Sequence, residues 1–292
     1  LGGSPVLAYN LVLLAGFALT AWAMCLVVAR WTGDFPAGLA AGAMMAFNAH
    51  TITRLPHLQA QHAEFLPLAL LALDALLRGP RWSSAFWLSL CVALQGLTSI
   101  YLLVFTATAM VIAMLARPED WLGPPLRRLA PKLLAAAALT AIMLTPFLIP
   151  YWHLRGAGFA RSLDEAAFFA AGAENYLTAP SRFHALSGTA PALFPGAAAV
   201  VLAAMAIGSG VAFTDARARM CLAFGAVGVL LSLGPAVVPG YEQLYSALPF
   251  LQAIRVTSRF GYLGLVAVAV LGGYGLAEIR RRVAIGAGGK LA

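Results

Sequence analysis

The stretch WSSAFWLSLCVALQGLTSIYLLVFTATAMVIAMLA, residues Trp82–Ala116, determines the fold class. It continues for 35 residues without a charged side chain. About 20 apolar helical residues cross a hydrocarbon core roughly 30 Å thick, so the stretch is too long for a single span. A polar break, Gln95-Gly96-Leu97-Thr98-Ser99, divides it near the middle. We therefore expect two consecutive membrane helices, one on each side of this break.

The composition extends this prediction to the whole chain. Hydrophobic residues make up 61% and charged residues 10% of the sequence, and the mean hydropathy is +0.84. A soluble domain is about 45–50% apolar and about 25% charged. The apolar runs are rich in Leu and Ala and do not alternate with polar residues, which favours helices over a membrane barrel. The predicted fold is all-α, a polytopic transmembrane helix bundle.

The apolar runs predict about nine helices in a single transmembrane domain that covers residues 1–292. The expected helices are the two halves of Trp82–Ala116 and the runs Val6–Ala29, Phe35–Ile52, Glu64–Leu77, Leu133–Pro150, Gly196–Phe213, Met220–Gly234 and Phe260–Ile279. Three long connections, residues 48–64, 151–195 and 235–259, are then expected on one side of the membrane.

The basic residues predict which side that is, because Lys and Arg are enriched in cytoplasmic loops. One set of connections holds 13 of the 19 basic residues, namely Arg30, Arg78, Arg81, Arg117, Arg127, Arg128, Lys132, Arg217, Arg219, Arg280, Arg281, Arg282 and Lys290. The opposite set holds the other 6, namely Arg54, Arg155, Arg161, Arg182, Arg255 and Arg259. We expect a multi-pass protein of the inner (plasma) membrane with a cytoplasmic C-terminus. Because the basic residues form short clusters between apolar runs, no nucleic acid partner is expected.

Residues 48–64 form the most polar outer connection. Glu64 lies beside an apolar run, and histidines precede it in the chain. A carboxylate held near imidazoles suits general acid–base chemistry or the binding of a sugar or a cation. The catalytic candidates are Glu64, His57 and His62, and the substrate-binding candidates are Asn48, Arg54 and Gln59. The alternative is an ordinary solvated loop.

Arg255 and Arg259 lie four residues apart where the last apolar run begins. One helical turn would place both guanidiniums on the same face. Such a pair can hold a phosphate or diphosphate through planar, forked hydrogen bonds. The alternative is a pair of anchors for lipid headgroups.

No metal site can be identified from the sequence. His57 and His62 are five residues apart, which on a helix separates them by about 140°. The cofactor is therefore undetermined, and a requirement for a divalent cation stays open. Cys25, Cys91 and Cys221 all lie inside apolar runs, which indicates buried thiols without a disulfide framework.

Two further patterns lie inside predicted helices. Asp74 precedes Arg78 by four residues, a spacing that favours a simple ion pair on one helix face. The run Gly272-Gly273-Tyr274-Gly275 indicates close packing against neighbouring helices rather than a nucleotide-binding loop.

Four short phrases resemble a group of bacterial multi-pass proteins that look like the GT-C superfamily of membrane glycosyltransferases. This superfamily includes the protein O-mannosyltransferases and the lipid A aminoarabinose transferase. The phrases are Ser4–Leu11, Ala46–Gln59, Leu193–Gly196 and Arg255–Phe260. The resemblance implies a GT-C-like bundle that transfers a sugar from a polyprenyl-phosphate-linked donor to a glycan, lipid or protein acceptor on the non-cytoplasmic face of the bilayer.

The resemblance also implies roles for particular residues. In such enzymes an acidic residue in the first outer loop is central, and we expect this chain to be a fragment that starts after that loop and lacks the first helix. Glu64, His57 and His62 would then be active-site candidates of the second outer loop, and Arg255 and Arg259 would hold the lipid phosphate. The alternative function is a non-catalytic transporter, flippase or assembly subunit for lipid-linked glycans.

Overall fold

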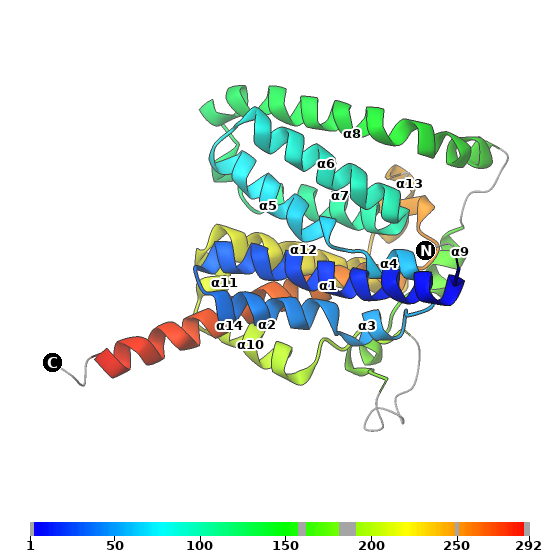
Figure 1. The fold of residues 1–292 in the computed structure, drawn as a ribbon. Coiled ribbons are helices and arrows are strands. Elements are labelled where there is room, and N and C mark those ends of the chain that lie inside the picture. The colour runs from blue at the N-terminus through cyan, green and yellow to red at the C-terminus, as the bar shows by residue number, and fades with distance from the viewer. Residues whose placement is uncertain (1–2, 157–161, 181–190, 249–250, 289–292) are drawn as a thin grey trace.

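The computed structural model describes residues 3–156, 162–180, 191–248 and 251–288, and within them all regular structure is helical (Figure 1). The predicted all-α fold is confirmed. The longer helices are α1 (Pro5–Thr32), α2 (Phe35–Ala46), α5 (Phe65–Arg78), α6 (Trp82–Thr98), α7 (Ile100–Leu115), α8 (Pro124–Gly156), α10 (Ala197–Gly208), α12 (Ala216–Leu233) and α14 (Gly261–Gly288). The short elements are α3 (Ala49–Ile52), α4 (Leu58–Gln61), η1 (Pro118–Asp120), α9 (Leu163–Phe168), η2 (Ala173–Leu177), α11 (Val211–Thr214), α13 (Tyr241–Ala247), η4 (Leu251–Ala253) and η5 (Thr257–Phe260).

The first two helices form a tightly packed hairpin. Ser4 caps α1 by accepting a hydrogen bond from the backbone N–H of Leu7, and Gly33 ends the helix in the left-handed conformation at φ 72°. Asp34 caps α2 two residues after α1 ends. A Cβ atom on Gly38 would lie 2.6 Å from the carbonyl oxygen of Cys25, so the close approach of the two helices depends on glycine.

Helix α14 is the centre of the bundle, and α8 lies at its edge. α14 packs against α2, α10 and α12, and 83% of its most apolar window is buried. Gly273 leaves room for Val28 of α1, and Gly275 leaves room for the backbone of α10 at Leu202, so the predicted close packing of this glycine run is confirmed. Helix α8 packs mainly on α6, and Figure 1 shows it as the outermost helix.

Five helical segments among the described residues are long and apolar enough to cross a membrane: Pro5–Thr32, Leu58–Arg78, Pro124–Pro150, Ala216–Leu233 and Thr257–Ile285. Three more apolar helices, α2, α7 and α10, are shorter. The 12 residues of α2 rise only about 18 Å, well short of a hydrocarbon core. The structure therefore supports several spans but does not show nine.

Two predicted helices are broken in the structure. The run Phe35–Ile52 is interrupted after Ala46, where the side chain of Asn48 accepts a hydrogen bond from the backbone N–H of Thr51 and begins α3. The run Gly196–Phe213 is interrupted at Gly210, which has a φ of 82°. Both breaks occur because a side-chain cap or a left-handed glycine competes with a continuous helical backbone. By contrast, the division of Trp82–Ala116 is confirmed, with Ser99 separating α6 from α7.

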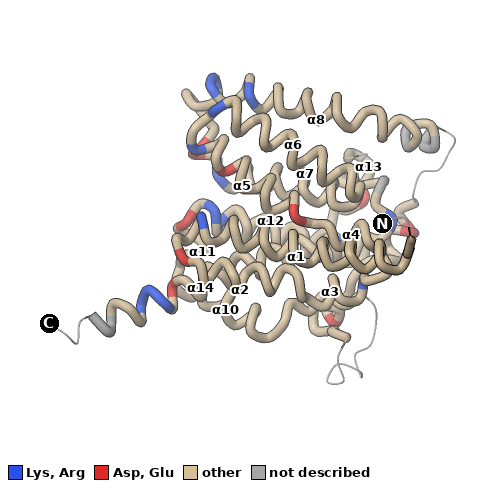
Figure 2. The backbone as a smooth tube through the Cα atoms, in the orientation of Figure 1, with Lys and Arg blue, Asp and Glu red and all other residues tan. Residues whose placement is uncertain are grey.

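Most charged residues lie toward the ends of the bundle, and Lys and Arg are concentrated at the end where α5 finishes and α8 begins, while one acidic position lies in the middle (Figure 2). At that end Asp74 is fully buried and accepts hydrogen bonds from Arg117 at 2.8 Å and Arg217 at 3.0 Å. The predicted pair with Arg78 is confirmed at 3.3 Å, but Asp74 is the shared partner of three arginines. This cluster ties α5 to the segment after α7 and to α12.

Candidate functional site

Segment 48–64 descends along α1 into the bundle. The hydroxyl of Tyr9, near the start of α1, donates to the carbonyl of Leu55, and the hydroxyl of Thr20, about halfway along α1, donates to the carbonyl of Gln61. A Cβ atom on Gly16 would lie 3.0 Å from that same Gln61 oxygen, so glycine permits the close approach. Non-helical backbone at this depth must be satisfied by protein groups. Glu64, predicted at the end of an outer connection, thus lies beside Thr20, about halfway along α1.

Glu64 and His62 form a hydrogen-bonded pair at the bottom of this segment. His62 Nδ1 lies 3.0 Å from Glu64 Oε1, and His62 Nε2 lies 3.0 Å from the carbonyl oxygen of Val12. Because a carbonyl only accepts, Nε2 carries a hydrogen and donates. The contact between Nδ1 and Oε1 then contains one shared proton, as either imidazolium with carboxylate or imidazole with carboxylic acid. The carboxylate and the imidazole are thus held within hydrogen-bond distance of each other.

Neighbouring helices hold this pair in position. The hydroxyl of Thr20 lies 3.4 Å from Glu64 Oε2 and also accepts a hydrogen bond from the backbone N–H of Ala63. Gln95 of α6 donates to the carbonyl of His62 at 2.9 Å and to the hydroxyl of Thr98. The side chain of Glu64 is only 6% exposed. α1 thus holds both side chains, through Thr20 and the carbonyl of Val12, while α6 holds the backbone of His62.

The other candidates of segment 48–64 divide into structural and exposed residues. Asn48 is buried and accepts from the backbone and the hydroxyl of Thr51, so it acts as a helix cap. His57 and Gln59 are exposed, and His57 does not join the Glu64–His62 pair. The segment is held by Gln61, which sequence reasoning did not select and whose amide donates to the carbonyls of Thr51 and Arg54.

Arg54 and Arg259 form a second cluster at the same end of the bundle. The two guanidiniums lie close enough for their positive charges to interact, and burial together with this repulsion lowers the pKa of Arg54 to about 10. The guanidinium of Arg259 lies 4.4 Å from the centre of the Tyr101 ring. Within the described residues, no carboxylate pairs with either arginine. This cluster is therefore a half-buried concentration of positive charge that an anion would stabilise.

His50 lies beside the two arginines and is buried. Burial, followed by the charges of Arg54 and Arg259, lowers the pKa of His50 to about 3, so its imidazole is neutral near pH 7. His50 Nδ1 and Arg259 Nε are both buried without a hydrogen-bond partner in the described part of the chain. The His50 ring packs on Tyr262 at 5.6 Å, and Tyr262 interacts electrostatically with Glu64. His50 thus lies between the arginine cluster and Tyr262 of α14.

The predicted stacking of Arg255 with Arg259 on one helical turn is wrong. Arg255 precedes the 3-10 turn η5, and its guanidinium donates to Glu165 at 2.7 Å and lies over the ring of Phe169. Arg259 lies inside the turn and points to Tyr101 instead. The carboxylate of Glu165 holds the guanidinium of Arg255, although the charge of Arg255 still acts on Arg259. Arg54 takes the place that was predicted for Arg255.

The structure describes only part of the second outer connection and of the predicted metal and thiol features. The connection 151–195 includes Arg161, Arg182 and His184, which lie outside the described residues. Within the part of the chain that is described, three or more His, Cys, Asp or Glu side chains nowhere gather as a metal site would require. Cys91 and Cys221 are buried free thiols, and Cys25 is half-buried.

Several site residues escaped the sequence analysis. Thr20 and Tyr262 lie inside apolar runs, where the sequence pattern does not distinguish them from other helix residues. Gln95 and Thr98 belong to the polar break Gln95–Ser99. This break was the sequence feature that could have indicated their part in the site. Comparison with protein families, curated proteins and solved structures found no match.

Proposed function

We propose that this protein is a membrane-embedded glycosyltransferase that uses a polyprenyl-phosphate-linked sugar as its donor. The observation that carries the proposal is the half-buried Arg54–Arg259 cluster, which has no carboxylate partner among the described residues. Two uncompensated guanidiniums among apolar helices favour an anionic ligand that also has a long apolar portion. A polyprenyl phosphate has both properties.

The Glu64–His62 pair supplies the acid–base group of the proposed reaction. The oxygen of an acceptor hydroxyl attacks the anomeric carbon of the sugar, and its proton passes to the Glu64 carboxylate. The bond between the anomeric carbon and the phosphate oxygen breaks, and its electron pair stays on the phosphate. Arg54 and Arg259 stabilise the negative charge that develops there. The products are the glycosylated acceptor and polyprenyl phosphate.

The helix lengths and the distribution of basic residues support a location in the inner membrane. Five apolar helical segments have the length of a span, and most charged residues lie toward the ends of the bundle. The smaller share of basic residues lies at the end that carries the candidate site, which favours the non-cytoplasmic face. The proposed location is therefore the inner membrane, with the site open to the outer side.

Binding of a polyprenyl monophosphate to the purified protein tests the donor assignment. We expect Arg54→Lys and Arg259→Lys each to weaken binding about ten-fold, because a lysine keeps the charge but loses the planar fork of donors. Arg255→Lys is the matched control and should bind normally, since Arg255 pairs with Glu165. Equal affinities for wild type, Arg54→Lys and Arg259→Lys would remove the phosphate site from the proposal.

Transfer of a labelled sugar in reconstituted membranes tests the reaction itself. Release of polyprenyl phosphate together with a labelled acceptor supports the transferase. Movement of the intact lipid-linked sugar across the bilayer, without cleavage of its phosphate bond, would instead identify a transporter.

A further inference from the structure

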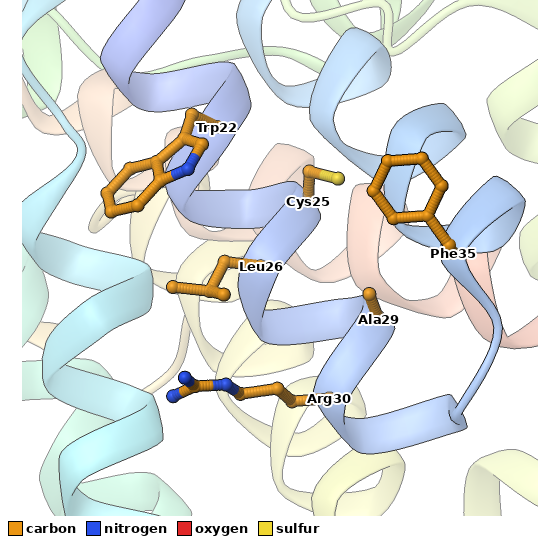
Figure 3. A pocket seen from close by; sticks show the side chains of 6 residues that line it. All are labelled: Trp22, Cys25, Leu26, Ala29, Arg30 and Phe35. Carbon is orange, nitrogen blue, oxygen red and sulfur yellow. The ribbon is translucent and has the colours of Figure 1, made fainter.

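A second apolar surface lies along α1 after Thr20, toward the C-terminal end of the helix. Trp22, Leu26 and Arg30 follow one another at four-residue intervals along one side of the helix, while Phe35 of α2 lies on the other side (Figure 3). Together with Cys25 and Ala29 they enclose an open groove of about 270 Å³. The candidate site does not use any of these residues.

The groove is apolar except at one end. Trp22 and Phe35 are more than half exposed, although both are large aromatic side chains. Only a third of the most apolar window of α1 is buried inside the protein. The exposed aromatic surface is therefore suited to contact with hydrocarbon rather than with water.

Arg30 supplies a positive charge at the end of the groove. Its side chain is exposed, and no carboxylate pairs with it in the part of the chain that the structure describes. The nearest acidic residue in the sequence, Asp34, is bound to Arg280 at 2.8 Å. Arg30 is thus free to attract an anion, and its last-turn position keeps the guanidinium near the end of α1.

The dimensions of the groove fit one leaflet of a bilayer. Trp22 and Arg30 are separated by eight residues, which corresponds to about 12 Å along a helix. One leaflet contributes about 15 Å to the hydrocarbon core. A lipid phosphate at Arg30 would therefore allow an acyl chain to extend along Leu26 to Trp22 without leaving its leaflet.

We infer that this groove binds an anionic phospholipid, with the phosphate at Arg30 and one acyl chain against Leu26 and Trp22. The inference rests on placing α1 in a membrane and is independent of the transferase activity. It assigns α1 two different functions along its length. One half supports the Glu64–His62 pair, and the other half holds a structural lipid at the positively charged end of the bundle.

Native mass spectrometry of the detergent-purified protein tests the inference. The probes are phosphatidylglycerol and phosphatidylcholine with identical acyl chains. Wild type should retain one phosphatidylglycerol about ten-fold better than phosphatidylcholine. Arg30→Gln should abolish this preference, and Trp22→Ala should weaken retention of both lipids by shortening the apolar wall.

Arg127→Gln is the matched control, because Arg127 is an exposed arginine of α8 that lines no part of the groove. It should retain the wild-type preference. An unchanged preference in Arg30→Gln, or an equal loss in Arg127→Gln, would overturn the assignment. A protein dimer that forms with loss of the lipid in the same spectra would also overturn it, by showing that a second copy occupies the groove.

Discussion

At the scale of single residues, the polar groups of the candidate site have separate tasks. Glu64 and His62 form a hydrogen-bonded pair, whereas Arg54 and Arg259 concentrate positive charge. Sequence reasoning selected all four side chains because polar residues are unusual beside apolar helices. It could not select Thr20 or Tyr262, because the contact of Thr20 with Glu64 and that of Tyr262 with His50 depend on how α1 and α14 pack.

Glu64→Gln should lower the rate of sugar transfer by about 100-fold, which is the scale of a lost general acid or base. The amide is nearly isosteric and can still accept from Thr20, so the melting temperature should change little. Turnover in reconstituted membranes is the measurement, with Glu242→Gln as an exposed control on α13. Full activity of Glu64→Gln would exclude the carboxylate from the chemistry.

His50 should make the stability of the protein depend on pH. Its folded-state pKa of about 3 lies below the ordinary value of 6.5, so the unfolded chain binds a proton that the folded protein does not. The stabilisation is complete above pH 6.5 and declines as the pH falls toward 3, by about 1.4 kcal/mol per pH unit. His50→Gln should flatten the fall in thermal stability between pH 6 and pH 4. An identical pH profile would show that His50 titrates normally.

At the scale of helices, periodicity predicted where apolar segments lie but not where they break. The split of Trp82–Ala116 was visible as a cluster of polar residues. The break after Ala46 depends on a single cap at Asn48, and the break before α11 depends on Gly210. In both cases one residue competes with an apolar pattern that continues on either side. Hydrophobic length alone therefore overestimated the number of complete spans.

The packing of α14 on α10 should depend strongly on Gly275. A Cβ atom there would collide with the backbone carbonyl of Leu202, which cannot rotate away as a side chain can. Gly275→Ala should therefore lower the free energy of unfolding by about 1–3 kcal/mol, the usual cost of overpacking. Gly208→Ala is the control on α10, because nothing lies within 4 Å of its added Cβ. Equal thermal stability of the two variants would contradict this packing.

At the scale of the whole molecule, the charge distribution gives the clearest link between sequence and structure. Counting basic residues predicted two unlike faces, and the structure concentrates Lys and Arg at one end of the bundle. The count could not reveal that Asp74 joins three arginines from distant segments, or that segment 48–64 descends along α1. Those features depend on tertiary contacts between residues far apart in the chain.

Cysteine labelling should establish the orientation of the bundle. Starting from Cys25→Ser, a membrane-impermeant thiol reagent added to intact spheroplasts should label Gln59→Cys but not Leu122→Cys. Both positions are exposed and lie at opposite ends of the bundle. Permeabilised cells should show labelling of both variants, which controls for access to each thiol. The reverse pattern in intact cells would invert the topology.

The Asp74 cluster has a consequence for the order of events during synthesis. Arg78 is made four residues after Asp74, Arg117 follows 43 residues after it, and Arg217 follows 143 residues after it. A ribosome that adds about 5–20 residues per second needs roughly 7–30 s to travel from Asp74 to Arg217. The carboxylate is therefore neutralised in stages, first within its own helix and last by α12. Until α12 is synthesised, the Asp74 carboxylate in the first half of the bundle lacks the hydrogen bond that Arg217 donates in the folded protein.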